Sequence, residues 1–389
     1  MPKVLEKAKK MQNRTRPERH TISSYSVLSN SPPSRPFIIP VFLPHAGCPH
    51  QCVFCNQKII THATDSLPSD SEIISFIRAW LKYRTPDRSS VQIAFFGGNF
   101  LGIEIPEIIR LLTIAQQFVL DGSVDSIRFS TRPDTITPSH LELLAGFPVT
   151  TIEIGAQSMN DMVLELCQRG HTALDTVQAV HLLRDSGYTV GIQMMTGLPG
   201  SDASVDISSG LRIADLHPDF VRIYPAVVLD HSLLARWYRA GRYTPMPLLE
   251  SVTLVKQLYL IFHEARIPVI RMGLQVSTDM GSTAMVLAGP LHPAFGHLVM
   301  AEIYRDNTLE ILKRHHECGD RIWLGVHPRR VSVMRGLKNE NIRYLSEQLC
   351  STHIAVEACP QLSDHQIAWK IVSDIRQAEG YCNVFDMIP

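Results

Sequence analysis

The chain has 389 residues, of which 45% are hydrophobic and 19% are charged, and its formal net charge is zero. This length suffices for one large α/β core and a smaller unit, and the composition is that of a soluble globular protein. No run of 18 uninterrupted apolar residues occurs, so we expect no membrane-spanning helix. Eight cysteines in a chain this long do not make a disulfide scaffold, which indicates a reducing, cytoplasmic location.

Positive charge gathers at the N-terminal end. Residues 1–35 carry eight Lys and Arg against two Glu, a net charge of +6, so the remainder has a net charge near −6. The segment lacks the apolar stretch of a secretory signal. We interpret it as a basic, disordered leader, with an RNA-contacting arm and an organelle transit peptide as alternatives.

From residue 37 to about 265, short apolar or β-branched runs alternate with helical patterns. Ser69 and Glu72 have the capping-box form at the start of the first helix, and apolar residues follow at helical spacing. We expect strands at 37–43, 91–96, 126–131, 149–154, 189–195 and 220–224, with helices at about 104–120, after 138, at 173–187 and at 202–216. Six β–α units imply a parallel sheet, either doubly wound or curled into a barrel.

Polar and glycine-rich motifs follow the expected strands directly. Cysteines follow the first strand, Gly-Gly-Asn the second, Thr-Arg-Pro-Asp the third and Gly-Ala-Gln-Ser the fourth. A barrel brings all these carboxyl ends to one mouth, where active sites of this architecture lie. We therefore predict an α/β fold, a partial (β/α)6 TIM-like barrel over residues 36–275, with a smaller C-terminal α+β extension over 276–389.

Three cysteines follow the first expected strand with the spacing CxxxCxxC: Cys48, Cys52 and Cys55. Thiolates this close together can hold one metal centre. A 4Fe-4S cluster normally takes four cysteines, so three would leave one iron open. The alternative is a zinc site completed by a nearby histidine, which is His45, His50 or His62. The other five cysteines are scattered, and we interpret them as ordinary buried residues.

Six further phrases follow the cysteines in order. They are FFGGNF (95–100), TRPD (131–134), EIGAQS (153–158), RGHT (169–172), GYTVGIQMMTGLPG (187–200) and DFVRIYPAVVLDHSLLARWYRAGRY (219–243). With these phrases the chain resembles the radical S-adenosylmethionine (SAM) superfamily. Residues 37 to about 275 resemble the radical domain of the catalytic subunit of Elongator, a tRNA wobble-uridine modifying enzyme. EIGAQS and GLPG are also similar to phrases of oxygen-independent coproporphyrinogen oxidases.

Two departures from the Elongator pattern limit what the resemblance implies. The Elongator subunit has a longer spacer between its first two cysteines than the one between Cys48 and Cys52. It also has a C-terminal acetyltransferase domain, and no stretch after residue 275 matches that domain. The Elongator reaction is therefore not transferred to this chain from the resemblance.

The resemblance implies a cofactor site. It assigns Cys48, Cys52 and Cys55 to a 4Fe-4S cluster, whose open iron binds SAM, and a low-potential electron donor then drives cleavage to a 5'-deoxyadenosyl radical. The implied SAM contacts are Phe54, Gly97, Gly98, Asn99, Glu153 and Gln193. The alternatives are a simple Gly-Gly turn, polar strand residues that line a solvated mouth, and loop packing by the phenylalanine.

The candidate catalytic residues on the substrate side are Arg169, His171 and Tyr224, with Arg132 and Gln157 beside them. A surface arginine, a capping histidine and a tyrosine hydroxyl that finds a local partner are the alternatives. The leading function is modification of RNA, with tRNA as the partner. A radical SAM enzyme acting on a small metabolite such as a tetrapyrrole, and a non-catalytic metal-bound RNA-binding module, remain open.

The portion after residue 275 is expected to cover the open side of the barrel and to select the substrate. GPLHPAFG (289–296) predicts an ordered turn before a helix at about 298–305. HPRRVSVMRGLKN (327–339) predicts a basic surface around a strand at 331–333, either a phosphate or RNA contact or a solvated face. We expect helices at 341–349 and 363–377.

Overall fold

The computed structural model describes residues 36–43, 46–49, 51–56, 67–85, 90–274, 286–315, 317, 319–351, 353–372 and 377–385. The basic leader, the three histidines of the zinc alternative and Cys318 lie outside these residues. The predicted domain boundary at residue 275 also falls outside them and stays a prediction.

Seven parallel strands form the main sheet, in the order β1-β2-β3-β4-β5-β6-β8. They are β1 (Phe37–Phe42), β2 (Val91–Phe96), β3 (Ser126–Thr131), β4 (Val149–Gln157), β5 (Thr189–Thr196), β6 (Phe220–Pro225) and β8 (Val269–Met272). All six expected strands are confirmed. The seventh, β8, is only four residues long, too short for its periodicity to stand out in the sequence.

Contacts across one face show that this sheet is curled into a half-barrel. Three strands separate β2 from β6, which in a flat sheet places the two about 19 Å apart. Yet the Arg222 guanidinium lies 5.4 Å from the ring of Phe96. The Arg128 guanidinium on β3 likewise lies 5.2 Å from the Phe220 ring on β6. The predicted partial barrel is therefore confirmed, and alternate residues of each strand face its interior.

Helices cover the convex face of the sheet, and their apolar sides form the main core with the outward strand residues. In β2, Val91, Ile93 and Phe95 are buried in this core together with Leu111 and Leu112 of the helix that follows. Full burial of such a side chain contributes about 1.5–3 kcal/mol. The helices are α3 (Asp70–Leu81), α4 (Ile105–Leu120), α5 (Pro138–Leu144), α6 (Asp161–Leu166), α7 (Ala173–Asp185), α8 (Ala203–Asp215), α9 (Leu233–Arg239) and α10 (Leu248–Glu264).

The predicted capping box of α3 is present. The Ser69 hydroxyl accepts a hydrogen bond from the Glu72 backbone N–H, and the Ser69 N–H donates to the Glu72 carboxylate at 2.8 Å. Two short 3-10 helices, η1 (Phe100–Gly102) and η2 (Pro133–Thr135), follow β2 and β3 at the mouth of the barrel. A two-stranded sheet of β7 (Val228–Leu229) and β9 (Val286–Ala288) also follows β6 there.

The C-terminal portion forms a separate four-stranded sheet in the order β11-β10-β12-β13. Its strands are β10 (Arg321–Val326), β11 (His353–Ala358), β12 (Gln366–Val372) and β13 (Gln377–Asn383). Around it lie α11 (Phe295–Lys313), η4 (Pro328–Arg330), α12 (Val331–Arg335), η5 (Leu337–Asn339) and α13 (Glu340–Gln348). The predicted α+β character of this portion and its helices at 298–305 and 341–349 are confirmed, the first within the longer α11.

Two predicted elements in this portion are wrong. The Val-Ser-Val run at 331–333 is the start of α12, because packing of Val333 and Met334 in the core overrides its local β-propensity. The predicted helix at 363–377 is instead β12. Its apolar residues Ile367, Trp369 and Ile371 recur at every second position and pair with β10. The hydrophobic pattern of this segment therefore has the two-residue period of a strand, and not the period of a helix.

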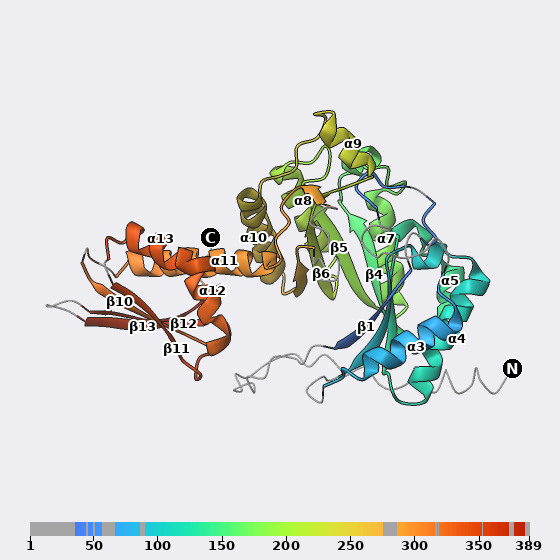
Figure 1. Ribbon diagram of the computed structural model, residues 1–389, viewed down its shortest axis with the longest axis horizontal. Coiled ribbons are helices and arrows are strands. Elements are labelled where there is room, and N and C mark those ends of the chain that lie inside the picture. The colour runs from blue at the N-terminus through green and yellow to red at the C-terminus, as the bar shows by residue number, and fades with distance from the viewer. Residues whose placement is uncertain are drawn as a thin grey trace.

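Helix α11 joins the barrel to the C-terminal sheet (Figure 1). At its N-terminal end, Phe295 packs against Gly273, where a Cβ would lie 2.6 Å from the phenylalanine Cβ. Farther along, Asp306 pairs with Lys256 of α10 at 2.7 Å. On the other side the Asn341 amide of α13 donates to the Ala301 carbonyl at 2.8 Å. One helix therefore packs on both parts of the chain.

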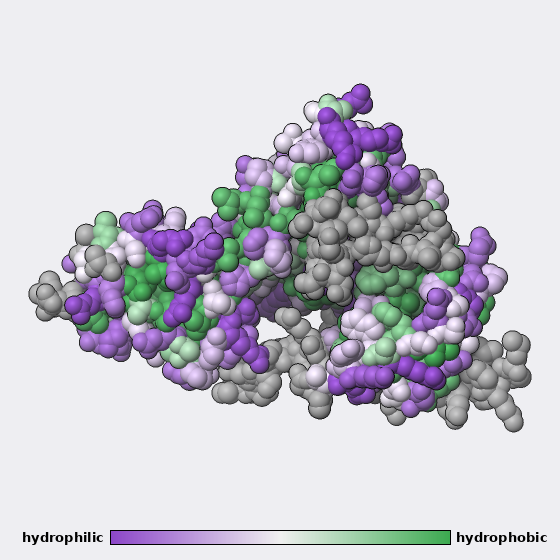
Figure 2. All heavy atoms as spheres, in the orientation of Figure 1, coloured by the Kyte–Doolittle hydropathy of each residue, from purple (hydrophilic) through white to green (hydrophobic). Residues whose placement is uncertain are grey.

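Within the described ranges, no helix is both long enough and apolar enough to cross a membrane. Figure 2 shows hydrophilic side chains gathered over α9, at the top of the view, where Arg236 and Arg239 are exposed.

Candidate active site at the carboxyl end of the sheet

The cysteine loop leaves the carboxyl end of β1. The Leu43 N–H donates to the Phe96 carbonyl of the neighbouring β2 at 2.6 Å, so the chain stays in the sheet until the loop begins. Cys52 is buried, and Cys48 and Cys55 are partly exposed. The loop is therefore placed at the barrel mouth, as the pattern of motifs predicts.

Glycines seat this loop on the turn after β2. At Gly98 a Cβ would lie 2.5 Å from the Ala46 carbonyl oxygen, and at Gly47, where φ is +69°, it would lie 2.2 Å from the Asn99 carbonyl oxygen. At Gly102 a Cβ would lie 2.2 Å from the Gly47 carbonyl oxygen. Any side chain at these positions forces the two segments apart. The Gly-Gly turn thus serves close approach of backbone to backbone.

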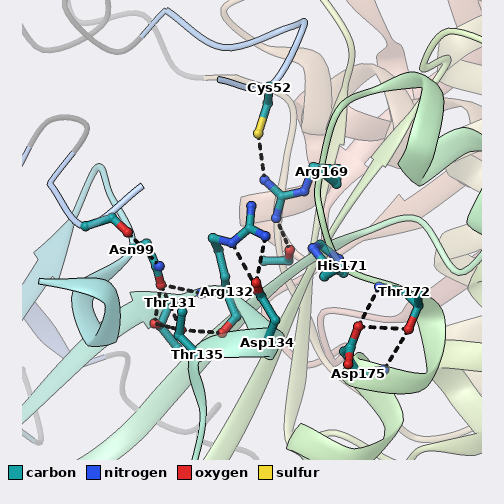
Figure 3. A network of polar contacts seen from close by, with 12 residues as sticks. Cys52, Asn99, Thr131, Arg132, Asp134, Thr135, Arg169, His171, Thr172 and Asp175 are labelled. Carbon is teal, nitrogen blue, oxygen red and sulfur yellow. Dashed lines mark hydrogen bonds and ion pairs between the residues drawn. The ribbon is translucent and has the colours of Figure 1, made fainter. Parts of the chain in front are cut away.

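Asn99 binds the same two segments through its side chain. Its Oδ1 accepts hydrogen bonds from the Thr131 hydroxyl at 2.7 Å, the Thr135 hydroxyl at 2.9 Å and the Arg132 backbone N–H at 3.0 Å. Its Nδ2 donates to the Gly47 carbonyl at 2.8 Å. Asn99 is fully buried, so this side chain connects the cysteine loop to the ends of β2 and β3 (Figure 3).

Arg169 contacts the middle cysteine. One guanidinium nitrogen donates to the Cys52 sulfur at 3.1 Å, and the other donates to the Gly155 carbonyl at 2.6 Å, as Figure 3 shows. Only 6% of the Arg169 surface is exposed. The arginine therefore joins the cysteine loop to the end of β4, where a register shift between Gly155 and Gln157 bends the strand.

The back of the loop is closed by apolar residues. The Val53 N–H donates to the Cys167 carbonyl at 3.1 Å, and the Val53 carbonyl accepts from the Leu234 N–H at 2.8 Å. Val53 and Cys167 are fully buried, and Phe54 packs both against them and against a second cluster that contains Leu234 and Ala235 of α9. Burial, with Cys52 nearby, raises the pKa of the Cys167 thiol to about 12, so this thiol stays protonated.

Electrostatics at the loop are set by burial and by two arginines. Burial, followed by the nearby Cys52, raises the pKa of the Cys48 thiol, while Arg169 and Arg132 act to lower it. Arg132 is itself held by Asp134, with nitrogen–oxygen distances of 2.8 and 3.0 Å. The net direction is upward, so burial outweighs the positive charge that lies next to this thiol.

His171 lies behind Arg169 (Figure 3). Its Nε2 is 3.3 Å from the Ala156 carbonyl oxygen, and the side chain is buried. Burial, then Arg169 and Arg132, lower the pKa of the imidazole to about 4. The histidine is therefore neutral at pH 7 and donates to that carbonyl. Gln157, also predicted, adopts a positive φ of 68° at the bend of β4.

The remaining predicted residues lie inside the barrel, away from the loop network. Glu153 of β4 is completely buried, and its carboxylate pairs with Arg222 at 2.8 Å and with Arg128. The Gln193 amide donates to the same carboxylate at 3.2 Å. The Tyr224 hydroxyl accepts from Arg222 at 3.3 Å. The structure thus divides the predicted residues into a group at the cysteine loop and a group on the inner wall.

Arg128, Arg222 and Cys167 are site residues that the sequence reasoning missed or took as ordinary. Each arginine stands between two apolar residues of its strand, and this alternation is the signal that could have identified both as inward-facing. Cys167 carried no such signal, because its position behind Cys52 depends on the fold. Of the other scattered cysteines, Cys359 is buried, whereas Cys350 is exposed, which corrects the prediction for Cys350.

The donor chemistry fits an iron-sulfur cluster. Three thiols on one loop, with cationic hydrogen-bond donors beside them, provide soft anionic ligands and the surroundings that stabilise them. In the part of the chain that the structure describes, no three His, Cys, Asp or Glu side chains converge as one metal ion requires. A cluster does not require the three sulfurs to meet at one point, because each sulfur binds a different iron.

Two family models match this chain. Residues 42–205 match the Radical SAM superfamily, and residues 218–305 match the Radical_SAM C-terminal domain. The first range contains the cysteine loop and strands β2 to β5, and the second begins just before β6 and extends into α11. The matches therefore cover the half-barrel and its mouth.

Curated relatives carry the names of tRNA-modifying proteins. A tRNA uridine(34) acetyltransferase of Dehalococcoides mccartyi is 26% identical over 232 residues, which cover 51% of this chain and 50% of that protein. The protein of that name from Methanocaldococcus jannaschii is 35% identical over 128 residues, with coverages of 32% and 24%. Elongator complex protein 3 of Mus musculus is 29% identical over 162 residues, with coverages of 38% and 30%. The chain spans half or less of the length of these relatives.

A solved structure shares the fold. It is the archaeal Methanocaldococcus infernus Elp3 with an N-terminal deletion, which superimposes with a TM-score of 0.55 at 20% identity and covers 70% of this chain and 63% of that chain. The curled parallel sheet, the three-cysteine loop at its mouth and the two family matches agree, and this chain, which is similar to Elongator complex protein 3 over part of its length, belongs to the radical SAM superfamily of enzymes.

Proposed function

We propose that this protein is a radical SAM enzyme that binds a 4Fe-4S cluster through Cys48, Cys52 and Cys55 and modifies tRNA. The observation that carries the proposal is the seating of a three-thiol loop on the carboxyl end of the parallel sheet. Cys48, Cys52 and Cys55 would hold the cluster, which would supply the electron for reductive cleavage of SAM and so the chemistry for removing hydrogen from the substrate.

The chain's own residues prepare this site. The three thiols provide the ligands, and the Arg169 guanidinium fixes the Cys52 sulfur by a 3.1 Å hydrogen bond. Gly98 and the Asn99 side chain fix the loop on β2. Val53 and Cys167 exclude water from behind it, because both are fully buried. The site is therefore pre-organised before any cofactor arrives.

The proposed SAM contacts fall into two kinds. Phe54 and Gln193 are half-buried, and Gly97 and Gly98 expose their backbone at the mouth, so these four can touch the cofactor directly. Asn99 and Glu153 have their side-chain oxygens already hydrogen-bonded, so we assign them the positioning of their neighbours. His171 and Tyr224 remain our candidates beside the substrate, and Arg169 acts on it through the cysteine loop.

Cluster formation is tested by anaerobic reconstitution of the full chain with iron and sulfide. The wild-type protein should gain the visible absorbance of a cluster and form 5'-deoxyadenosine from SAM after reduction. Cys52→Ala should lose both signals, because two thiolates hold a cluster poorly. Cys359→Ala, in the C-terminal sheet, is the matched control and should retain both. Absence of both signals in the wild-type protein would remove the enzymatic proposal.

The tRNA substrate is supported by the names of the relatives, and the C-terminal portion (276–389) is proposed to select it. Its predicted basic segment leaves Arg329 and Lys338 exposed, whereas Arg330 pairs with Asp364 at 3.4 Å. Filter binding of the purified chain to total tRNA at several salt concentrations tests this. We expect binding that weakens as salt increases. No binding above that of a neutral control protein at low salt would refute it.

A further inference from the structure

The inner wall of the half-barrel carries more positive than negative charge. The residues that face inward on the central strands are neutral apart from Arg128 of β3, Glu153 of β4 and Arg222 of β6. These three side chains meet, since the carboxylate pairs with both guanidinium groups. Two cations share one anion, so these three side chains together carry a net charge of +1; Arg271 of the edge strand β8, the register partner of Arg222, lies on the same face of the sheet.

No further acceptor capacity remains on that carboxylate. Its Oε1 accepts from Arg128 and from Arg222 Nη2 at 3.1 Å, and its Oε2 lies 2.8 Å from Arg222 Nε and accepts from the Gln193 amide at 3.2 Å. Only 4% of the Arg128 surface is exposed, and its Nε has no hydrogen-bond partner. A buried charge without compensation is costly, so this cluster favours the approach of an anion.

The cluster has a buried lower layer and an open upper layer. Below, Arg128 lies over the Phe220 ring, which fits because Gly191 has no side chain where a Cβ would lie 2.3 Å from that ring. Above, Arg222 keeps 13% of its side chain exposed, and Gln193 and Tyr224 are half-buried. These three groups are the ones that a molecule inside the barrel can reach.

The open layer offers hydrogen-bond donors from two of its side chains. Arg222 contributes a guanidinium, whereas the Gln193 amide N–H₂ is already committed to the Ser130 hydroxyl at 3.1 Å and to the Glu153 carboxylate at 3.2 Å. The Tyr224 oxygen already accepts from Arg222, so its own O–H is directed away and can donate to a ligand. Donors beside an excess positive charge are the surroundings in which oxyanions bind.

We propose that the inner wall around Arg222 and Tyr224 is a binding site for a substrate oxyanion, a phosphate or a carboxylate, held inside the barrel. This inference deepens the proposed function by naming a chemical group of its substrate. It assigns the excess charge to substrate recognition, with Glu153 as the internal counter-ion that sets how strongly an anion is held.

The test measures anion binding by the purified chain without cluster or SAM. Thermal unfolding is followed against inorganic phosphate at constant ionic strength, with chloride as the balancing ion, because screening changes with salt. Phosphate should stabilise the wild-type protein. Arg222→Gln should weaken phosphate binding about tenfold or more, as loss of a charge-assisted hydrogen bond does. Arg222→Lys, which keeps the charge, should retain part of it.

A second variant is expected to strengthen phosphate binding, and a misfolded protein would not show this result. Glu153→Gln removes the internal counter-ion, so phosphate should bind more tightly than to the wild-type protein. Arg110→Gln, which breaks an exposed ion pair with Asp70 on the convex face, is the control and should bind like the wild type. Equal binding by the wild type, Arg222→Gln and Glu153→Gln, or no binding by the wild type, would overturn the inference.

Parallel titrations with uridine 5'-monophosphate and with succinate distinguish the sources of the oxyanion. Tighter binding of the nucleotide supports a nucleic-acid phosphate, and tighter binding of succinate supports the carboxylate of a small metabolite. The outcome is independent of SAM cleavage. If the chain binds phosphate but forms no 5'-deoxyadenosine, the anion site is supported and the proposed function is refuted. If it forms 5'-deoxyadenosine but does not bind phosphate, the proposed function is supported and the anion site is refuted.

Discussion

At the scale of single residues, the role of a polar side chain here follows from its partners. Asn99 and Arg169 both lie in motifs whose residues the family resemblance assigns to cofactor or substrate binding. In the structure each side chain is committed to the cysteine loop, through Gly47 and Cys52 respectively. Their hydrogen bonds therefore make the loop geometry a property of the folded chain.

Arg169→Met should loosen this geometry. The variant removes the donors to the Cys52 sulfur and to the Gly155 carbonyl, and we expect the free energy of unfolding to fall by about 1.5–3 kcal/mol in urea titrations. In the reconstituted protein the cluster should also have a more negative reduction potential, because a donor to a ligating thiolate stabilises the reduced state. Potentiometric titration followed by electron paramagnetic resonance measures that shift.

The control for this variant is Arg236→Met on α9, an exposed arginine on the outer surface. It should change neither the free energy of unfolding nor the potential by a measurable amount. If Arg169→Met lowers stability but leaves the potential at the wild-type value, the arginine has a structural role only.

At the scale of elements, the loop after β5 depends on one buried carboxylate at the start of α8. Asp206 accepts from the Gly197 N–H at 2.8 Å and from the Ser201 hydroxyl at 2.6 Å. The Tyr243 hydroxyl donates to the Gly197 carbonyl at 2.7 Å from the other side. The Gly-Leu-Pro-Gly turn at the mouth is thus held at both faces.

The raised pKa of Asp206 predicts that the stability of the protein depends on pH. Burial raises the pKa of this carboxyl from 3.8 to about 6, and the two hydrogen bonds oppose that rise only in part. The folded state therefore binds the proton more tightly than the unfolded state. The resulting stabilisation is complete below about pH 4 and is lost as the pH rises through 6, with a magnitude of about 3 kcal/mol.

The measurement compares the wild type with Asp206→Asn in urea unfolding between pH 4 and pH 7. The asparagine can accept from Gly197 and donate to Ser201 without titrating, so the free-energy difference between the two proteins should change across this range. A difference that stays constant from pH 4 to pH 7 would contradict the assignment of the raised pKa to Asp206.

At the scale of the whole molecule, α11 makes one structural unit of two sheets. Its residues pack on α10 and on α12 and α13, so both parts of the chain share one apolar core. Ile303, in the middle of the helix, is fully buried in that core. The C-terminal sheet is therefore coupled to the barrel by packing as well as by chain connection.

Ile303→Ala should lower the free energy of unfolding by about 2–5 kcal/mol through the cavity it leaves. Because α11 is shared, we expect a single unfolding transition shifted to lower temperature in both circular dichroism and tryptophan fluorescence. Leu249→Ala, an exposed position on α10, should leave the transition in place. Two separate transitions in the wild-type protein would show that the two sheets are not coupled through this helix.

The sequence predicted the barrel well because each of its long elements is locally consistent. Outward residues such as Ile93 and Phe95 make the strands apolar, and Ser69 and Glu72 mark a helix start at short range. The four-residue strand β8, and the helix at 331–335, could not be predicted because tertiary packing decides them. Likewise the three cysteines can be recognised as a motif in the sequence, whereas Arg128, Glu153 and Arg222 come into contact only when the sheet curls.

The backing of the cysteine loop has a consequence for biosynthesis. Cys52 is joined to Arg169, and Val53 to Cys167 and Leu234, all of which are translated long after the thiols. At a translation rate of about 5–20 residues per second, the three thiols leave the ribosome on the order of tens of seconds before the residues that contact the loop have been synthesised. During that interval they are open to oxidants and to stray metal ions. Under the proposed function we therefore expect stable iron loading only after the second half of the barrel has folded, when late residues such as Leu234 cover the loop.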